Sequence, residues 1–239
     1  MIELSHIKVY GFEEAIRGMR NSWDSWDDSD FCPDDIGENN LALMRRLAKS
    51  GPDHAKFLRM INVSMDILAP LYWWKEFDTY KIGTSANSCS TMHTICKKEF
   101  ATKDFSCEKL SGPTIPNVIP PYDIFCFTIL RLNELRFVYL NGLTDEEGNV
   151  LFEPKNKDIW YQIIQLLPSS YNQLRTVTLN YEVLRRIYAA RKDHKLDEWR
   201  TFCEEMTCFP VCSLITMKDE KTEWTHLDPT GVNRVIIVN

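Results

Sequence analysis

Residues 180–191, NYEVLRRIYAAR, carry the helical pattern on which both the fold and the function of this chain depend. At about 100° per residue, eleven residues return a helix to within ~20° of its starting direction. Asn180, Leu184, Ile187 and Arg191 are therefore predicted to share one face. An arginine at the end of an apolar stripe faces a desolvation cost unless an anionic or carbonyl group meets it. The alternative is that Arg191 reaches solvent or pairs with a nearby carboxylate.

Working outward from this helix, apolar spacing predicts more helices and few strands. The predicted helices are Glu13–Met19, Asn40–Ala48, Ser64–Phe77 with a bend at Pro70, Asp123–Tyr139, Asp158–Leu167 and His194–Met206. The predicted strands are Ile7–Tyr10, Lys56–Val63 and a hairpin or irregular strand pair within Trp224–Val238. The expected fold is a helix-rich α+β domain with a small antiparallel sheet, a single domain over residues 1–239.

The composition indicates a globular protein. The chain has 239 residues, of which 44% are hydrophobic and 26% charged, and a net charge of -6. The negative charge argues against a general nucleic-acid binder, which needs a basic face for phosphates. No apolar run approaches the ~20 residues that span a bilayer, and the N-terminus lacks the pattern of a signal peptide. The eight cysteines are therefore expected to be free thiols in a reducing cytoplasm.

Two groups of residues contain side chains that can bind metal ions. Cys203, Cys208 and Cys212 contain no CxxC pair, and structural zinc sites usually use such tight pairs, so small buried side chains are the favoured interpretation. The acidic segment Asp24–Asp35 suits either a divalent cation or, more often, a solvated loop. No metal site is predicted.

Two further segments have the composition of a ligand site. Residues 82–90, IGTSANSCS, combine hydroxyls, an amide and small side chains that let a backbone approach a phosphate or a base edge. Tyr72, Trp73, Trp74 and Lys75 precede them and could stack on a flat ring. The alternatives are an ordinary polar loop and packing of the aromatic residues in the core. The sequence has no P-loop, Rossmann glycine fingerprint, HExxH or GxSxG.

Taken in order, these segments resemble the flavin-dependent thymidylate synthase family. Members of that family carry a Ser after a strand, then an Arg-His-Arg triplet, then a loop Ser-x-Asn-Glu-x-Ser-x-Arg-Tyr. Here Ser64 begins the stretch, Trp73-Trp74-Lys75 occupy the triplet, and Ser85, Asn87, Ser88 and Ser90 fill the loop, with Met92-His93 at its end.

Shorter similarities extend the resemblance on both sides. They are Arg20-Asn21-Ser22, Pro52-Asp53-His54, Leu167-Pro168, the eleven-residue spacing from Asn180 to Arg191, and the acidic and Trp region at Asp197, Glu198 and Trp199. The resemblance covers about residues 17–206 and leaves residues 207–239 as a C-terminal extension.

The resemblance implies a homotetramer that binds FAD and dUMP where subunits meet and methylates dUMP to dTMP. Methylenetetrahydrofolate and NADPH would serve as co-substrates. Arg191 and Ser90 would be the catalytic residues, with Arg191 holding and polarising the uracil ring. The nucleotide would contact Ser85, Ser88, Ser90 and Arg191. The cofactor would contact Trp73, Trp74, Lys75, Asn87 and Asn180.

This sequence also departs from the family pattern. Only Lys75 keeps a charge at the triplet, and it lacks the bidentate fork of arginine. Ser88 replaces the glutamate of the loop, and Glu182 stands where members carry an arginine. Two further readings therefore remain: a protein of the same fold that binds a nucleotide or flavin without this reaction, and a different enzyme on the same scaffold.

Overall fold

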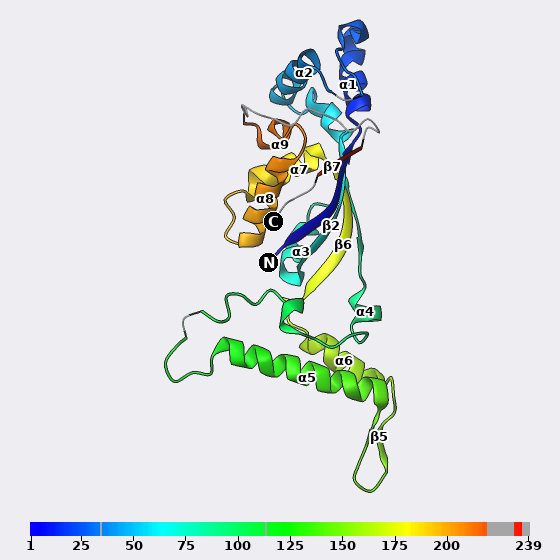
Figure 1. Ribbon diagram of the computed structural model, residues 1–239, viewed down its shortest axis with the longest axis vertical. Coiled ribbons are helices and arrows are strands. Elements are labelled where there is room, and N and C mark those ends of the chain that lie inside the picture. Colours follow the sequence, from blue (N-terminus) through cyan, green and yellow to red (C-terminus); the bar gives the residue numbers. More distant parts are fainter. Residues whose placement is uncertain (34, 113, 219–231, 236–239) are drawn as a thin grey trace. The chain divides into compact units, whose positions relative to one another are not determined.

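A computed structural model describes residues 1–33, 35–112, 114–218 and 232–235, the last four through their backbone alone (Figure 1). The chain forms two compact units. The helical unit comprises Met1, Ala69–Trp74 and Ser88–Gln173, and the sheet unit comprises Ile2–Leu68, Lys75–Asn87 and Leu174–Asn239. The single domain expected from the sequence stays a prediction.

A five-stranded sheet has the strand order β3-β6-β2-β1-β7. Strand β1 pairs antiparallel with both β2 and β7, and its pairing with β2 shifts register between Ser5 and Lys8. The strands are β1 Glu3–Tyr10, β2 Asn62–Pro70, β3 Thr84–Ser88, β6 Asn172–Asn180 and β7 Val232–Val235. The predicted pairing within Trp224–Val238 lies outside the described residues except for β7. The helix-rich α+β class with a small antiparallel sheet is confirmed.

Strand β2 corrects two predictions from the sequence. The predicted strand Lys56–Val63 is instead a 3-10 helix, Ala55–Arg59, and the predicted helix from Ser64 is a strand as far as Pro70. The side chains of Val63, Met65, Ile67 and Ala69 are buried in strict alternation along β2. This period of two buries one side of the strand completely, and that burial outweighs the capping preference of Ser64.

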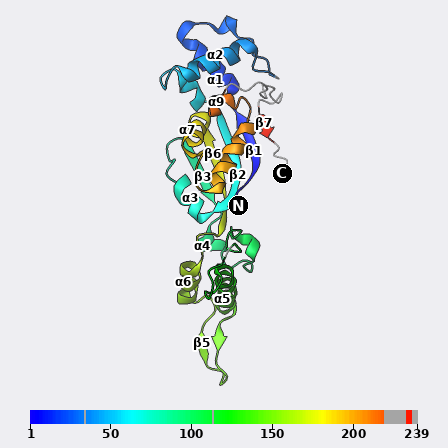
Figure 2. The same cartoon turned by 90° about the vertical axis from the view of Figure 1, so that its left-hand side faces the viewer.

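The helices of the sheet unit include α7 and α8, which lie on one face of the sheet in both views (Figures 1 and 2). Leu184 and Ile187 of α7 are fully buried, as their shared stripe predicts, and so are Trp199 and Phe202 of α8. The helices are α1 Phe12–Arg20, α2 Glu38–Lys49, α7 Tyr181–Arg191, α8 Asp197–Glu205 and α9 Ser213–Thr216. Helix α3, Leu71–Phe77, has residues in both units.

The helical unit is built around α5 and α6, which lie side by side (Figure 2). Phe105, Phe125, Ile129 and Ile163 belong to its buried core. The side chain of Asn156 caps α6 by accepting hydrogen bonds from the amides of Asp158 and Ile159. Its elements are α4 Thr91–Thr94, α5 Pro121–Asn141, the strand pair β4 Leu143–Thr144 and β5 Val150–Phe152, and α6 Lys157–Leu166.

Short 3-10 helices also occur at Asn21–Trp23, Trp26–Asp28, Thr102–Asp104 and Met206–Cys208. No helix within the described residues combines the length and the apolar composition that crossing a bilayer requires. All eight cysteines are free thiols. Cys203 and Cys212 are buried and Cys208 is exposed, and burial raises the pKa of Cys203 to about 12.

The acidic segment caps a helix. Asp30 accepts hydrogen bonds from the backbone amides of Asn39 and Asn40 in the first turn of α2, at 2.8 and 3.1 Å. Gly37 (φ 82°) lies against this carboxylate, and a Cβ there would clash with it. Among the described residues, no three or more His, Cys, Asp or Glu side chains are placed to hold a metal ion.

Replacing Asp30 with alanine is expected to lower the free energy of unfolding by about 1 kcal/mol, the usual value for a lost cap. Burial opposes ionisation of Asp30, but the two amides and Arg20 outweigh it and hold the pKa of Asp30 below its ordinary 3.8. The stabilisation is therefore present above pH 3.8 and lost as the pH falls through the folded pKa. Chemical denaturation at several pH values tests this. Asp27→Ala, in the same loop, is the control, and an equal loss in both variants would contradict the assignment.

Candidate functional site

Arg191 ends helix α7, whose first turn is fixed by Asn180. The side-chain oxygen of Asn180 accepts a hydrogen bond from the amide of Val183 at 3.1 Å, so Asn180 is the N-cap of the helix. Eleven residues at 1.5 Å each separate the cap from Arg191 by about 16 Å. The two residues therefore lie at opposite ends of one rigid element.

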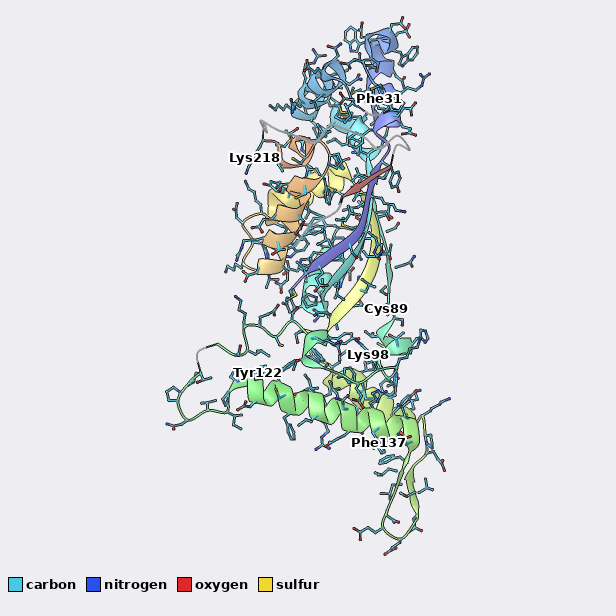
Figure 3. The ribbon with its side chains drawn as sticks, viewed as in Figure 1. Phe31, Cys89, Lys98, Tyr122, Phe137 and Lys218 are labelled. Carbon is cyan, nitrogen blue, oxygen red and sulfur yellow. The ribbon has the colours of Figure 1, made fainter. Side chains whose placement is uncertain are left out.

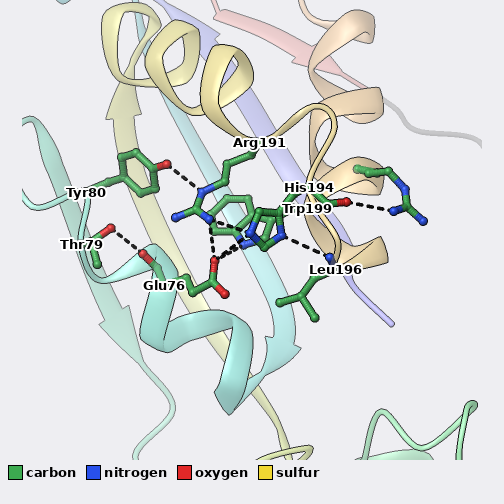
Figure 4. Close-up of polar contacts among 8 residues, drawn as sticks. Glu76, Thr79, Tyr80, Arg191, His194, Leu196 and Trp199 are labelled. Atoms are coloured by element: carbon green, nitrogen blue, oxygen red, sulfur yellow. Dashed lines mark hydrogen bonds and ion pairs between the residues drawn. The ribbon is translucent and has the colours of Figure 1, made fainter.

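The guanidinium of Arg191 lies in a network of polar and aromatic side chains (Figure 4). Its Nη1 donates to Glu76 Oε2 at 2.7 Å, and its Nε donates to the Tyr80 hydroxyl at 3.0 Å. The plane lies over the Trp199 ring, with Cζ 4.8 Å from the ring centroid. The Arg191 side chain is 19% exposed and the Glu76 side chain 34%. A half-buried carboxylate thus meets the arginine, which is one of the alternatives that the sequence left open.

Glu76 is the centre of this network. Its Oε2 also accepts from the indole N–H of Trp199 at 3.0 Å and lies 3.5 Å from Nε2 of His194. The amide of Leu196 donates to Nδ1 of His194 at 3.2 Å, and Nη1 of Arg191 lies 2.9 Å from Nε2 of the same ring. Arg191 and Trp199 therefore both donate to one carboxylate and hold it in place, with His194 beside them.

This arrangement fixes the direction of the arginine and leaves part of it available. Glu76 and Tyr80 engage Nη1 and Nε, and Trp199 covers one side of the plane. No residue in the described part of the chain accepts a hydrogen bond from Nη2 of Arg191. A positioned guanidinium nitrogen of this kind can donate to a carbonyl or an anionic oxygen from outside the chain.

The two tryptophans of the triplet positions are buried in the helical unit. Trp73 is 0% exposed and Trp74 1% exposed, and their rings meet edge to face at 4.9 Å. The indole N–H of Trp74 donates to the carbonyl of Gln173 at 2.9 Å. Lys75, the next residue, is exposed. Of the three positions, only Lys75 presents a polar group at the surface of the chain.

The polar segment predicted as a loop is strand β3, at one edge of the sheet. Ser85, Asn87 and Ser88 are exposed along it, and Ser90 follows at the start of α4, half-buried. The hydroxyl of Thr84 is buried, and none of the described residues lies within hydrogen-bond distance of it. A buried hydroxyl in this state calls for an explanation, for example an ordered water or a bound ligand.

Asn180 lies against the start of this segment. A Cβ added to Gly83 (φ 78°) would fall 3.1 Å from Nδ2 of Asn180 and 3.1 Å from the side chain of Val183. The sheet unit therefore brings Asn180 and residues 83–84 together. It places Arg191 at the other end of α7, beside Glu76.

Glu182, at a position where the resemblance places an arginine, forms an ion pair with Arg59. The hydrogen bond from Arg59 holds the pKa of Glu182 below its ordinary value, with burial opposing it. The anion expected beside the site therefore has a guanidinium next to it. This pairing was not predictable from local sequence, since 123 positions separate the two residues.

Three members of the Arg191 network were not predicted: Glu76, Tyr80 and His194. Glu76 directly follows Lys75, and His194 lies three residues beyond Arg191, so both adjoin predicted site residues. Two features of the sequence could have indicated the pair: the carboxylate of Glu76 next to the triplet positions, and Arg191, which requires an anionic or carbonyl partner. Only the contact between α3 and α7 in the folded chain shows that Glu76 and Arg191 pair.

Comparison with protein-family models and with curated protein sequences gives no match. The fold, however, matches two solved structures of ThyX, the flavin-dependent thymidylate synthase of Helicobacter pylori, each with FAD and dUMP. The first has a TM-score of 0.60 and 16% identity over 90% of this chain and 96% of the other. The second has 0.59 and 15% over 90% and 95%. The chain therefore has the helix-rich α+β fold found in flavin-dependent thymidylate synthases.

Proposed function

We propose that this protein is a flavin-dependent thymidylate synthase-like enzyme that methylates dUMP to dTMP. Methylenetetrahydrofolate would supply the methylene group, and NADPH would reduce the bound FAD. The observation that carries the proposal is Arg191, held by Glu76, Tyr80 and Trp199 with Nη2 left for an outside oxygen. The fold match to two enzymes in complex with FAD and dUMP supports it.

The residues present fit a flavin nucleotide mainly through neutral polar contacts. The buried hydroxyl of Thr84 lacks a partner among the described residues, and Asn87 is exposed on the same edge strand. Lys75 is the one cation at the triplet positions. Lys75, Asn87 and Asn180 would hold the cofactor, which when bound supplies a hydride. Trp73 and Trp74, whose side chains are buried, would not contact the cofactor directly.

The chain's own residues would bind and orient the nucleotide. Arg191 would donate through Nη2 to a uracil carbonyl and stabilise the negative charge that develops there. Glu76 would keep the guanidinium in this direction, and Trp199 would keep water from one side of its plane. Ser85, Ser88 and Ser90 would contact the nucleotide and Ser90 would take part in catalysis, as the resemblance implies.

A second function, nucleotide or flavin binding without methyl transfer, is favoured by the burial of Trp73 and Trp74. Two positions that carry arginine and histidine in the family present no cation here. A protein with this loss would retain the ligand site but stabilise a phosphate-rich ligand less well.

The two functions are separated by one series of measurements on the purified protein. Flavin absorbance and identification of the extracted cofactor show whether FAD binds. Tritium release from dUMP labelled at C5, with NADPH and methylenetetrahydrofolate present, shows whether the ring is methylated. Binding of FAD and dUMP without tritium release supports the second function. Absence of binding to either ligand overturns both.

We expect FAD to bind more weakly than in family members with the full triplet, because each lost charged hydrogen bond costs about 1.5–3 kcal/mol. Lys75→Ala is expected to weaken binding by a further ~1.5 kcal/mol, and Lys75→Arg to strengthen it by restoring a planar fork. Fluorescence titration of FAD at two salt concentrations tests this. Lys56→Ala, an exposed lysine outside the triplet, is the control. Tight binding that salt does not affect would show that other residues have taken over.

We also propose that the protein is a homo-oligomer, a tetramer as in the family that it resembles. Helix α5 supports this with a second apolar face, turned away from the core residues of the helical unit. Its side chains are 54–63% exposed: Ile124, Phe127, Leu130 and Phe137. Figure 3 marks Phe137 near the C-terminal end of the helix. A helix that is apolar on both sides is usually buried on both, here against another copy.

A further inference from the structure

The helical unit contains a pocket of about 290 Å³ that the proposed function does not use. It lies where residues 92–97 meet the C-terminal part of α5 and the start of α6. The pocket has three basic side chains, two aromatic ones and a thiol, and no carboxylate lines it. Its lining residues are Met92, His93, Ile95, Cys96, Lys97, Arg136, Tyr139, Leu140 and Trp160.

No carboxylate of the described residues forms an ion pair with the basic side chains of this pocket. Two nearby acids have other partners: Asp104 pairs with Lys98 at 2.6 Å and Glu134 with Arg131 at 2.7 Å. Within the described part of the chain, neither Lys97 nor Arg136 has a carboxylate within ion-pair distance. The pocket therefore has two cations available, and the imidazole of His93 can add a hydrogen bond.

Arg136 is the better placed of the two cations. Its side chain is half-buried, and Nε donates to the carbonyl of Cys96 at 3.0 Å, which fixes the direction of the guanidinium. The two terminal nitrogens are left as a fork for a second acceptor, the geometry that suits carboxylate or phosphate oxygens. Burial raises the pKa of Cys96, with Arg136 opposing it, so the thiol is neutral and adds no negative charge.

The other side chains that line the pocket are aromatic or apolar, and they favour a flat apolar ligand. Tyr139 and Trp160 are half-buried aromatic side chains, and Met92, Ile95 and Leu140 add apolar surface. Pockets for small molecules typically combine such apolar walls with a few convergent polar groups. An aromatic ring gains most from walls of this kind, because it can stack or pack edge to face.

We propose that this pocket binds a small planar anion, an aromatic ring that carries a phosphate or a carboxylate. Arg136 and Lys97 bind the anionic group, and Tyr139 and Trp160 pack against the ring. The proposal does not depend on methylation of dUMP, since Arg191 and its partners belong to the sheet unit and do not line the pocket.

Fluorine NMR of protein labelled with 5-fluorotryptophan tests the proposal. The Trp160 resonance is assigned by its loss in Trp160→Phe. Titration with phenyl phosphate or benzoate is expected to shift this resonance, and the tighter of the two identifies the anionic group. Inorganic phosphate and phenol should each bind at least tenfold more weakly than phenyl phosphate. If inorganic phosphate binds as well as phenyl phosphate, or if no ligand shifts the resonance, the proposal is overturned.

Matched variants show whether the pocket residues bind the ligand. Lys97→Gln and Arg136→Gln are each expected to weaken binding of the preferred anion at least fivefold. Lys97 is exposed, so its variant keeps the test valid even if Arg136→Gln unfolds. Arg131→Gln, on the same helix but outside the pocket, and Arg191→Ala should leave binding unchanged. An equal loss in Arg131→Gln would show a general charge effect and overturn the site, and an equal loss in Arg191→Ala would overturn its independence from the dUMP site.

Discussion

Replacing Arg191 with alanine is expected to weaken dUMP binding by roughly 2–4 kcal/mol, the loss of one positioned charged donor in a half-buried site. The reason is that Glu76 and Tyr80 already hold Nη1 and Nε, so that Nη2 needs no reorientation to meet a uracil carbonyl. Arg191→Lys should recover only part of the affinity, because an ammonium cannot both pair with Glu76 and reproduce the planar fork. Calorimetric titration of dUMP measures each value.

Thermal melting separates this role from a structural one. Arg191→Ala also removes a partner of Glu76, and we expect it to lower the free energy of unfolding by about 1–2 kcal/mol. Glu76→Gln keeps a side chain of the same size and the contact to Trp199, and it is expected to reduce dUMP affinity less than Arg191→Ala. If wild type binds dUMP and Arg191→Ala binds it equally well, the site assignment is wrong. If wild type binds no nucleotide and the variant only melts early, Arg191 is a structural ion-pair partner.

The second large effect is expected on helix α5. Phe127→Glu combined with Leu130→Glu should convert the oligomer into smaller species at micromolar concentration. Each side chain is more than half exposed in a single chain, and a buried aromatic anchor typically contributes 2 kcal/mol or more to an interface. The charged residues of this face, Arg131 and Glu134, already pair with each other at 2.7 Å, which lowers the cost of covering it.

Light scattering measures this change, and circular dichroism confirms that the helix is retained. Ile115→Glu is the matched control, because Ile115 is a 72% exposed apolar residue outside α5 and outside the segments of the candidate site. The control should keep the mass of the wild type. A wild-type monomer, or a double variant with unchanged mass, would show that the apolar face of α5 serves another purpose and would count against a tetramer.

The helices of this chain were predictable because their signals are local. Helix α5 was expected at Asp123–Tyr139 and found at Pro121–Asn141, and α7 follows its apolar stripe and begins directly after its Asn180 cap. Strand β2 was mistaken for a helix because Ser64 and the apolar residues after it suit either element. Strand β6 was missed altogether, since a strand depends on neighbours that are distant in sequence.

Some features of the candidate site were likewise predictable from the sequence, and others were not. The sequence placed Arg191 at the end of an apolar helical face and named Ser85, Asn87 and Ser88 in a polar segment, and these residues stay predicted contacts. It left open whether Trp73 and Trp74 face a ligand or the core, and the tertiary structure decided for the core.

The sequence by itself determined the helix-rich fold class and the order of motifs that resembles flavin-dependent thymidylate synthases. It also showed that Arg191, at the end of an apolar stripe, requires an anionic or carbonyl partner. Only the tertiary structure decided which partner that arginine has. Glu76 and Arg191 are 115 positions apart, and Arg59 and Glu182 are 123 apart. Local propensity extends over one or two turns of helix, whereas an ion pair forms wherever packing of the core brings two charges together. The direction of Arg191 is thus a property of the packed sheet unit rather than of residues 180–191.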